Sequence, residues 1–262
     1  MARFCTLFSG SSGNCTYIGS GSDGILVDAG VSAKRIEQAL YDREILPESI
    51  RAILITHEHI DHVKGIKTFA KRYRIPLYGS HGTLEALAET GLLPPDAELC
   101  EMNGVQTVGD MQVSAFRTSH DSAQSVGYTV ETATGRRVGI CTDTGFITDE
   151  AWEAIQGCHL VQMESNHDVD MLRSGAYPYP LKQRILSDCG HLSNDTCANA
   201  LPTLANNGAT RFVLAHLSRD NNTPTLAYAA ATNALVAAGL TDGIDYLLKV
   251  AAPISEERWM VF

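Results

Sequence analysis

The chain has 262 residues, of which 44% are hydrophobic and 19% are charged, an ordinary globular balance that can bury one large core. Its net charge of −10 argues against a nonspecific nucleic-acid-binding protein, although it leaves local basic patches possible. The seven cysteines are scattered and form no C-x-x-C pair, which argues against a disulfide framework and a zinc ribbon. Without an apolar leader or a long apolar run, we expect a cytoplasmic protein with no membrane partner.

Short apolar runs and amphipathic segments alternate along the chain. The runs predict strands at Phe4–Phe8, Thr16–Gly19, Ile25–Val27, Ala52–Ile55, Val113–Phe116, Val126–Val130, Arg137–Cys141, Leu160–Met163 and Phe212–Ala215. Helices are predicted at Ala33–Tyr41, Val63–Tyr73, Thr83–Thr90, Asp149–Ile155, Asp195–Asn206 and Thr225–Ala238. This order favours an α/β sandwich over a helical bundle. We expect a single domain over residues 1–262, with a small insertion on the substrate side at about 168–188.

The segment from Thr56 to His62 holds three imidazoles and one carboxylate directly after an apolar run. Further potential metal ligands also follow apolar runs, namely Asp28, His120, Asp143 and His216. Loops at the ends of strands in an α/β sheet can converge, so these side chains are expected to meet in one site.

The ligand types and their spacing predict a centre with two divalent ions. We expect His57, His59 and His120 to form one site. Asp61, His62 and His216 would form the second. Asp143 could bridge the two ions, and Asp28 would orient a ligand histidine. Mixed nitrogen and oxygen ligands suit zinc, manganese or iron.

These motifs resemble the metallo-β-lactamase superfamily. Further segments narrow the resemblance to its YycJ/WalJ-like exonuclease branch: Ser9–Asn14, His120-Asp121 with Gly127-Tyr128, Glu164–Asp168, Tyr177-Pro178 with Leu181-Lys182, Gly190–Asn194 and Leu214–Ser218. The resemblance implies a four-layer αβ/βα sandwich, two zinc or manganese ions, and a 5′-to-3′ DNA exonuclease with a possible DNA-repair role.

Two histidines outside the ligand set are candidates for a role in the reaction. Gly190–Ser193 precedes a helix whose N-cap is Ser193 or Asn194. A similar element in tRNase Z-type nucleases implies that His191 protonates the leaving 3′-oxygen, while a histidine that only caps the helix is the alternative. His167 could bind a phosphate or assist His191, or could equally make a buried structural hydrogen bond.

Candidate substrate contacts lie in three places. The Ser9–Asn14 loop is expected to form a tight turn, and Ser12 or Asn14 could also contact a phosphate. Lys64–Arg74 carries five basic residues and no acidic one, and we interpret Lys67–Arg74 mainly as a solvated helix face. Met171–Ser187 is the better substrate surface, because its cations could hold phosphates and its tyrosines could stack on bases; the candidates are Arg173, Tyr177, Lys182 and Arg184.

Phosphodiester hydrolysis of DNA is the reaction that fits these features best. A metal-bound hydroxide oriented by Asp61 would attack phosphorus, and His191 would protonate the leaving group. A small-molecule hydrolase of the glyoxalase II or lactonase kind is the alternative, and a metal-binding regulatory protein without turnover is a third.

Overall fold

The computed structural model describes residues 1–262 and divides into two compact units. Unit 1 contains Met1–Ala115, Ser122–Arg136 and Ala252–Phe262. Unit 2 contains Phe116–Asp121 and Arg137–Ala251. Each unit has its own hydrophobic core, as expected when a sheet face and its helices bury their apolar sides together.

Seven strands of unit 1 form a mixed sheet in the order β14-β1-β2-β3-β4-β5-β6. Strands β1 (Ala2–Phe8), β2 (Cys15–Ser20) and β3 (Asp23–Val27) pair antiparallel, and β14 (Met260–Val261) is antiparallel to β1. Strands β4 (Ile50–Leu54), β5 (Leu77–Gly79) and β6 (Leu99–Glu101) continue the sheet in parallel. A hairpin joins β7 (Gln106–Val108) to β8 (Met111–Arg117), and β9 spans Val126–Glu131.

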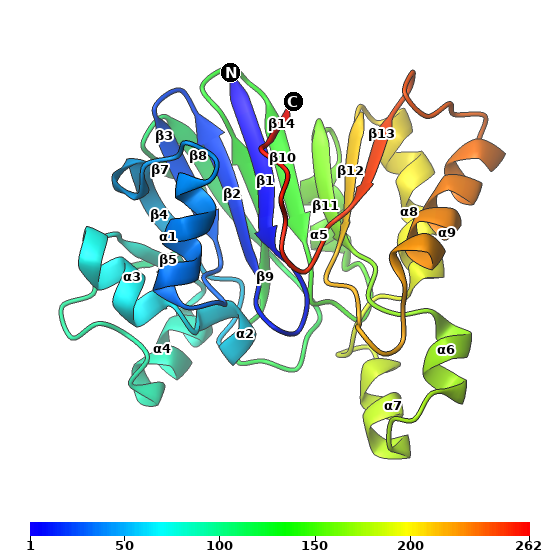
Figure 1. The fold of residues 1–262 in the computed structure, drawn as a ribbon, viewed down its shortest axis with the longest axis horizontal. Helices are drawn as coiled ribbons and strands as arrows, with labels where there is room; N and C mark the ends of the chain where they lie inside the picture. The colour runs from blue at the N-terminus through cyan, green and yellow to red at the C-terminus, as the bar shows by residue number, and fades with distance from the viewer. The chain divides into compact units, whose positions relative to one another are not determined.

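The helices of unit 1 are α1 (Ala33–Tyr41), the 3-10 helix η1 (Pro47–Ser49), α2 (Ile60–Val63), α3 (Ile66–Tyr73) and α4 (His81–Thr90). Helices α1 and α3 contact each other beside the sheet (Figure 1). Helix α3 buries Ile66, Phe69 and Ala70, a spacing that places the three side chains on one face. Its opposite face is exposed and carries lysine and arginine.

Unit 2 contains the parallel strands β10 (Arg137–Cys141), β11 (Leu160–Glu164), β12 (Arg211–Ala215) and β13 (Leu247–Val250), in that order. Its helices are α5 (Asp149–Ile155), α6 (Val169–Ser174), α7 (Tyr179–Ile185), α8 (Asn194–Asn206) and α9 (Pro224–Ala237). Helices α8 and α9 pack side by side (Figure 1).

The structure bears out most of the predicted elements and corrects one of them. All nine predicted strands are present, with ends that differ by up to two residues. The single helix predicted at Val63–Tyr73 is wrong, because the backbone breaks at Lys64 and Gly65 and forms α2 and α3 instead. Ser193 is the N-cap of α8, and none of the helices is long and apolar enough to cross a membrane.

Candidate metal centre

The first group of potential ligands lies in unit 1, where β4 leads through a short loop into α2. The His57 ring centroid is 4.6 Å from that of His59 and 4.1 Å from that of His62. Asp61 and His62 lie in the first turn of α2, with Asp61 Oδ2 3.5 Å from His62 Nε2. One segment of the chain thus gathers three imidazoles and a carboxylate.

Asp28, which directly follows β3, holds this group in place through hydrogen bonds of its carboxylate. Its backbone has a φ of 62°, a left-handed conformation that costs energy for a residue with a side chain. Its carboxylate accepts hydrogen bonds from His62 Nδ1 at 2.7 Å and from the Thr56 backbone N–H at 2.9 Å. Burial raises the pKa of Asp28, while His62 lowers it. Asp28 therefore holds the ring of His62, a potential metal ligand.

Close backbone packing fixes the position of Asp61. A Cβ on Gly30 would lie 1.6 Å from the Asp61 carbonyl oxygen, so any side chain at residue 30 would displace the loop. Asn14 donates its backbone N–H to the same carbonyl at 2.8 Å, and its side-chain amide lies 3.0 Å from His62 Nε2. The neighbouring Ser12 is exposed in the predicted turn between β1 and β2.

The second group of potential ligands lies in unit 2 and is assembled from separate segments. Asp143 follows β10, Glu164 ends β11, His191 precedes α8 and His216 follows β12. Their ligand atoms all lie within 4.8 Å of one another, so they could hold a metal ion. Asp143 and His216 also have positive φ angles, 55° and 57°, as Asp28 does in unit 1. Three strands thus turn sharply where they present a polar side chain.

Glu164 is a central residue of this group and is not among the site residues predicted from the sequence. Its Oε1 accepts hydrogen bonds from His191 Nδ1 at 2.7 Å and His216 Nδ1 at 2.9 Å. Its Oε2 accepts from the backbone N–H groups of Thr144 and Leu192. Burial would raise the pKa of this fully buried carboxyl, but the two histidines hold it below its usual range. With both oxygens occupied, Glu164 acts as an organiser of the two imidazoles.

His120 joins the second group from the loop after β8. Its Nδ1 donates to the Gly190 carbonyl oxygen at 3.1 Å, and its Nε2 lies 3.9 Å from Asp143 Oδ1. Burial lowers the pKa of His120, which favours the neutral imidazole that a metal requires. The neighbouring Asp121 is held by Arg184 of α7 in a bidentate ion pair, whose Nη2–Oδ1 distance is 2.9 Å.

Four histidines of the two groups are oriented as metal ligands usually are. A ligating imidazole typically binds a carboxylate or another acceptor through one nitrogen and presents the other to the ion. Nδ1 is bound in His62, His120 and His216, and His57 Nδ1 lies 3.0 Å from the Thr56 hydroxyl. Nε2 lies on the other side of each ring, and in His62 it is also 3.0 Å from the side-chain amide of Asn14. The donor sets therefore fit divalent metal ions.

His167 lies on the buried side of the second group. It is 1% exposed, and neither ring nitrogen has a hydrogen-bond partner, so the predicted structural hydrogen bond of its side chain is absent. Burial lowers its pKa to about 4. The backbone around it is well fixed, since the His167 carbonyl accepts from the N–H of Asn194 at 2.9 Å. The side chain is therefore a neutral imidazole in a tightly bonded surrounding.

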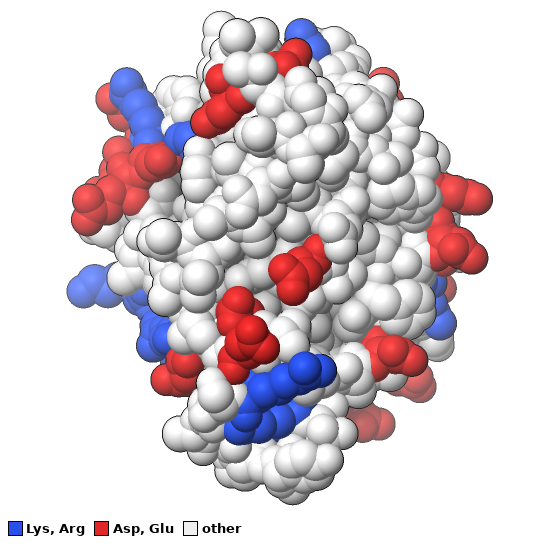
Figure 2. Space-filling model, turned by 90° about the vertical axis from the view of Figure 1, so that its right-hand side faces the viewer, with Lys and Arg blue, Asp and Glu red and all other residues white.

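Most of the predicted substrate contacts in unit 2 use their polar groups within the protein. Lys182 Nζ donates to the carbonyl oxygens of Arg173 and Gly175, both at 2.7 Å, which caps the end of α6. The Tyr177 hydroxyl donates to Asp220 at 2.7 Å. Figure 2 shows lysine and arginine atoms gathered low on this face, next to aspartate and glutamate. The 168–188 segment forms α6 and α7, and its cations are largely compensated.

Comparison of the sequence with known proteins gives a consistent result. Residues 24–217 match the family described as Beta-lactamase superfamily domain. The chain is 38% identical over 243 residues to "Exodeoxyribonuclease YycJ" of Bacillus anthracis, covering 92% of each chain. It is 36% identical over 255 residues to "Exodeoxyribonuclease WalJ" of Streptococcus pneumoniae, covering 96% of this chain and 94% of that protein.

Solved structures share the fold at low sequence identity. The metallo-β-lactamase fold protein YhfI of Bacillus subtilis aligns with a TM-score of 0.72 at 15% identity, over 97% of this chain and 98% of its own. The Zn²⁺-bound PqqB of Methylobacterium extorquens aligns with a TM-score of 0.66 at 19% identity, over 95% and 97%. The predicted metallo-β-lactamase αβ/βα sandwich is thus confirmed.

Proposed function

The chain belongs to the metallo-β-lactamase superfamily and, within it, to the YycJ/WalJ family, and from that membership we propose that it is a metal-dependent 5′-to-3′ DNA exonuclease with a role in DNA repair. The observation that carries this proposal is the 36–38% identity to two exodeoxyribonucleases over more than nine-tenths of the chain. The two groups of oriented histidines support it, because hydrolysis of a phosphodiester suits such ligands.

We propose that the ligands predicted from the sequence hold two divalent ions, zinc or manganese. Bound ions would lower the pKa of a water toward about 7 and neutralise charge on the phosphate. The protein's own contribution is orientation. Asp28 holds His62, and Glu164 holds His216, so that each ring presents Nε2. Asp61, whose side chain is 22% exposed, is close enough to His62 to orient the attacking water.

His191 is placed to supply a proton to the leaving 3′-oxygen. Its Nδ1 donates to Glu164 at 2.7 Å, which fixes the ring plane and leaves Nε2 as the atom that would carry the transferred proton. Its side chain is 14% exposed, whereas the Glu164 side chain beneath it is fully buried, so His191 is the member of this pair that a substrate can reach.

A digestion of end-labelled DNA tests the proposal. A short 5′-phosphorylated duplex and its single strand are incubated with the protein in zinc or manganese. We expect metal-dependent release of mononucleotides from the 5′ end. Asp61→Ala should abolish this release, whereas the matched control Glu153→Ala changes an exposed carboxylate on α5 and should not. If the fully metallated protein leaves the DNA intact, the nuclease proposal fails and a thioester or lactone substrate takes its place.

A further inference from the structure

The exposed side of α3 carries several lysines and arginines, and their positions are not explained by stabilisation of the helix alone. Five lysines and arginines lie within 64–74 without a single acid, in a chain of 20 basic and 30 acidic residues. Lys71 and Arg72 in the last turn suit the negative end of the helix dipole. Lys67 does not, because it lies in the first turn, where the dipole favours acids and α3 has none.

These side chains form a possible binding site for an anion. Lys67, Thr68, Lys71 and Arg72 are all exposed and together line a surface recess of about 500 Å³ that no carboxylate lines. Lys67 donates one hydrogen bond to the Gly91 carbonyl oxygen at 3.0 Å, and Arg72 pairs with Glu37. Lys71 has no hydrogen bond or ion pair within the protein. The recess therefore keeps positive charge and a hydroxyl for a ligand.

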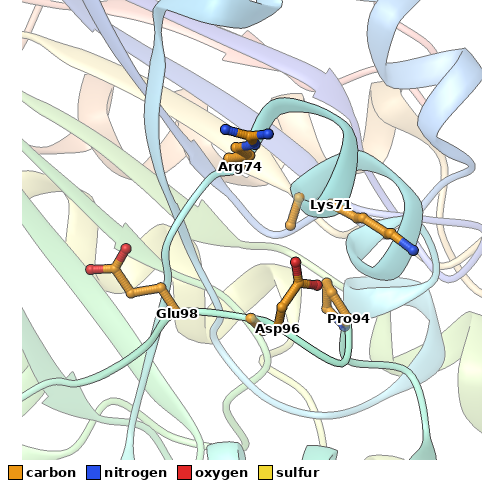
Figure 3. A pocket seen from close by; sticks show the side chains of 7 residues that line it. Lys71, Arg74, Pro94, Asp96 and Glu98 are labelled. Carbon is orange, nitrogen blue, oxygen red and sulfur yellow. The ribbon is translucent and has the colours of Figure 1, made fainter.

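One carboxylate near this face, that of Glu37, pairs with Arg72, and two others line a neighbouring pocket. A separate pocket of about 160 Å³ is lined by Lys71 and Arg74 from the helix side and by Asp96 and Glu98 from the segment between α4 and β6. Figure 3 shows that Lys71 and Arg74 extend in different directions, and neither forms an ion pair with these carboxylates. The two carboxylates of this pocket offset its two cations, so an anion is favoured in the recess, where only cations and Thr68 line the wall.

We infer that the α3 cationic face, defined here as Lys67, Thr68, Lys71 and Arg72, binds the sugar–phosphate backbone of the DNA strand that the enzyme retains between cleavage steps. The inference rests on the proposed nuclease function. Helix α3 follows α2, which carries Asp61 and His62, after two residues of the same unit. Lysine and arginine contacts to phosphates give affinity without reading sequence, as an exonuclease that proceeds along a strand requires.

Binding to a single strand that resists cleavage tests this surface directly. The probe is a 5′-phosphorylated 20-nucleotide oligothymidine with phosphorothioate linkages, titrated onto the metallated protein at several salt concentrations. Each lost phosphate contact makes the slope of log K against log salt shallower by about 0.7 for a single strand. We expect Lys67→Gln/Lys71→Gln to flatten the slope by about 1.4 and to weaken binding about 25-fold at 0.1 M salt.

The control double variant Arg117→Gln/Arg136→Gln removes the same two charges from exposed positions outside this face. It should keep the wild-type slope. If both double variants weaken binding equally, or if Lys67→Gln/Lys71→Gln keeps the wild-type slope, the inference is overturned. It is also overturned if the wild-type protein does not bind the probe.

A second readout uses catalysis and separates this inference from the proposed function. With heparin as a trap, the number of nucleotides released in one encounter should fall in Lys67→Gln/Lys71→Gln and not in the control. A protein that binds DNA through this face but releases no nucleotides would contradict only the proposed function. A protein that degrades DNA with unchanged salt dependence and unchanged release per encounter in the variant would contradict only the role of α3.

Discussion

The two groups of ligands are built in opposite ways. In unit 1, the residues from His57 to His62 come from one segment, and the strand that ends before it and the helix that begins within it set their positions. In unit 2, His120, Asp143, His191 and His216 come from four segments, and Glu164 from a fifth holds two of them. The contiguous group takes most of its geometry from one segment and has one imidazole held by Asp28, whereas the dispersed group has two imidazoles held by Glu164.

The two buried carboxylates that orient the histidines, Asp28 and Glu164, also differ in the number of groups they bind. Asp28 binds one imidazole and the neighbouring Thr56, whose hydroxyl also lies 3.0 Å from His57. Glu164 binds two imidazoles and two backbone N–H groups, and it is completely buried. Loss of the organiser should therefore be more severe in unit 2 than in unit 1, which the following variants can test.

The largest effect is expected for His191→Ala. Removal of a general acid typically lowers the rate by about 10²–10⁴-fold. Because His191 lies with Asp143 and His216 among the possible ligands, the metal content must be measured beside the rate. A slow variant with full metal content supports the role in protonation. Loss of metal together with activity would instead show that His191 is a metal ligand. The group in unit 2 would then have one ligand more than proposed.

Glu164→Gln should have the next largest effect. A carboxamide keeps the shape but loses the charge, and it can accept from only one of its two terminal atoms. The orientation of His191 and His216 should therefore loosen together, with metal affinity lower by about 100-fold, the upper end for residues that orient ligands. Competition with a chelator measures this affinity. The control Glu153→Gln alters an exposed carboxylate and should leave it unchanged; an unaltered affinity in Glu164→Gln would refute the organiser role.

The contrast between the groups also explains what the sequence could predict. The cluster at His57–His62 is visible because its spacing is local, and Asp28, Asp143 and His216 are visible because each follows an apolar run. Glu164 follows the Leu160–Met163 run in the same way and could have been found by the same rule. The spacing of residues in the sequence does not reveal which polar side chains form hydrogen bonds within the protein. Lys182 is an example, because its ammonium group donates to carbonyl oxygens at the end of α6.

The short strands β5, β6, β7, β13 and β14 escaped prediction for a related reason. They have only two to four residues, too few for a periodic pattern, and their place depends on the strands beside them. The break between α2 and α3 is another tertiary effect. Gly65 donates its N–H to the Ala29 carbonyl oxygen outside the helix, which competes with a continuous helical ladder.

Asp28→Asn should have a smaller effect than Glu164→Gln. Only the contact to His62 and the bonds to Thr56 are weakened, so metal affinity should fall about 10-fold, the lower end for such residues. The same chelator competition measures the change, with Asp110→Asn, a carboxylate bound to Ser20, as the control. A loss as large as that in Glu164→Gln would break the proposed contrast between one-imidazole and two-imidazole organisers.

The smallest expected effect is a dependence of the folding stability on pH, caused by His167 in unit 2. The imidazole of His167 is buried, and neither ring nitrogen forms a hydrogen bond. The pKa of His167 is about 4 in the folded protein, against about 6.5 when unfolded. Between these values the unfolded chain binds the extra proton, so stability is complete above pH 6.5 and falls as the pH drops. The free energy of unfolding should therefore fall by about 1 kcal/mol between pH 7.5 and pH 5.5 because of His167.

Urea unfolding at both pH values should show this loss in the wild type but not in His167→Gln. An equal loss in both proteins would mean that His167 is protonated when folded and is not buried in the neutral form.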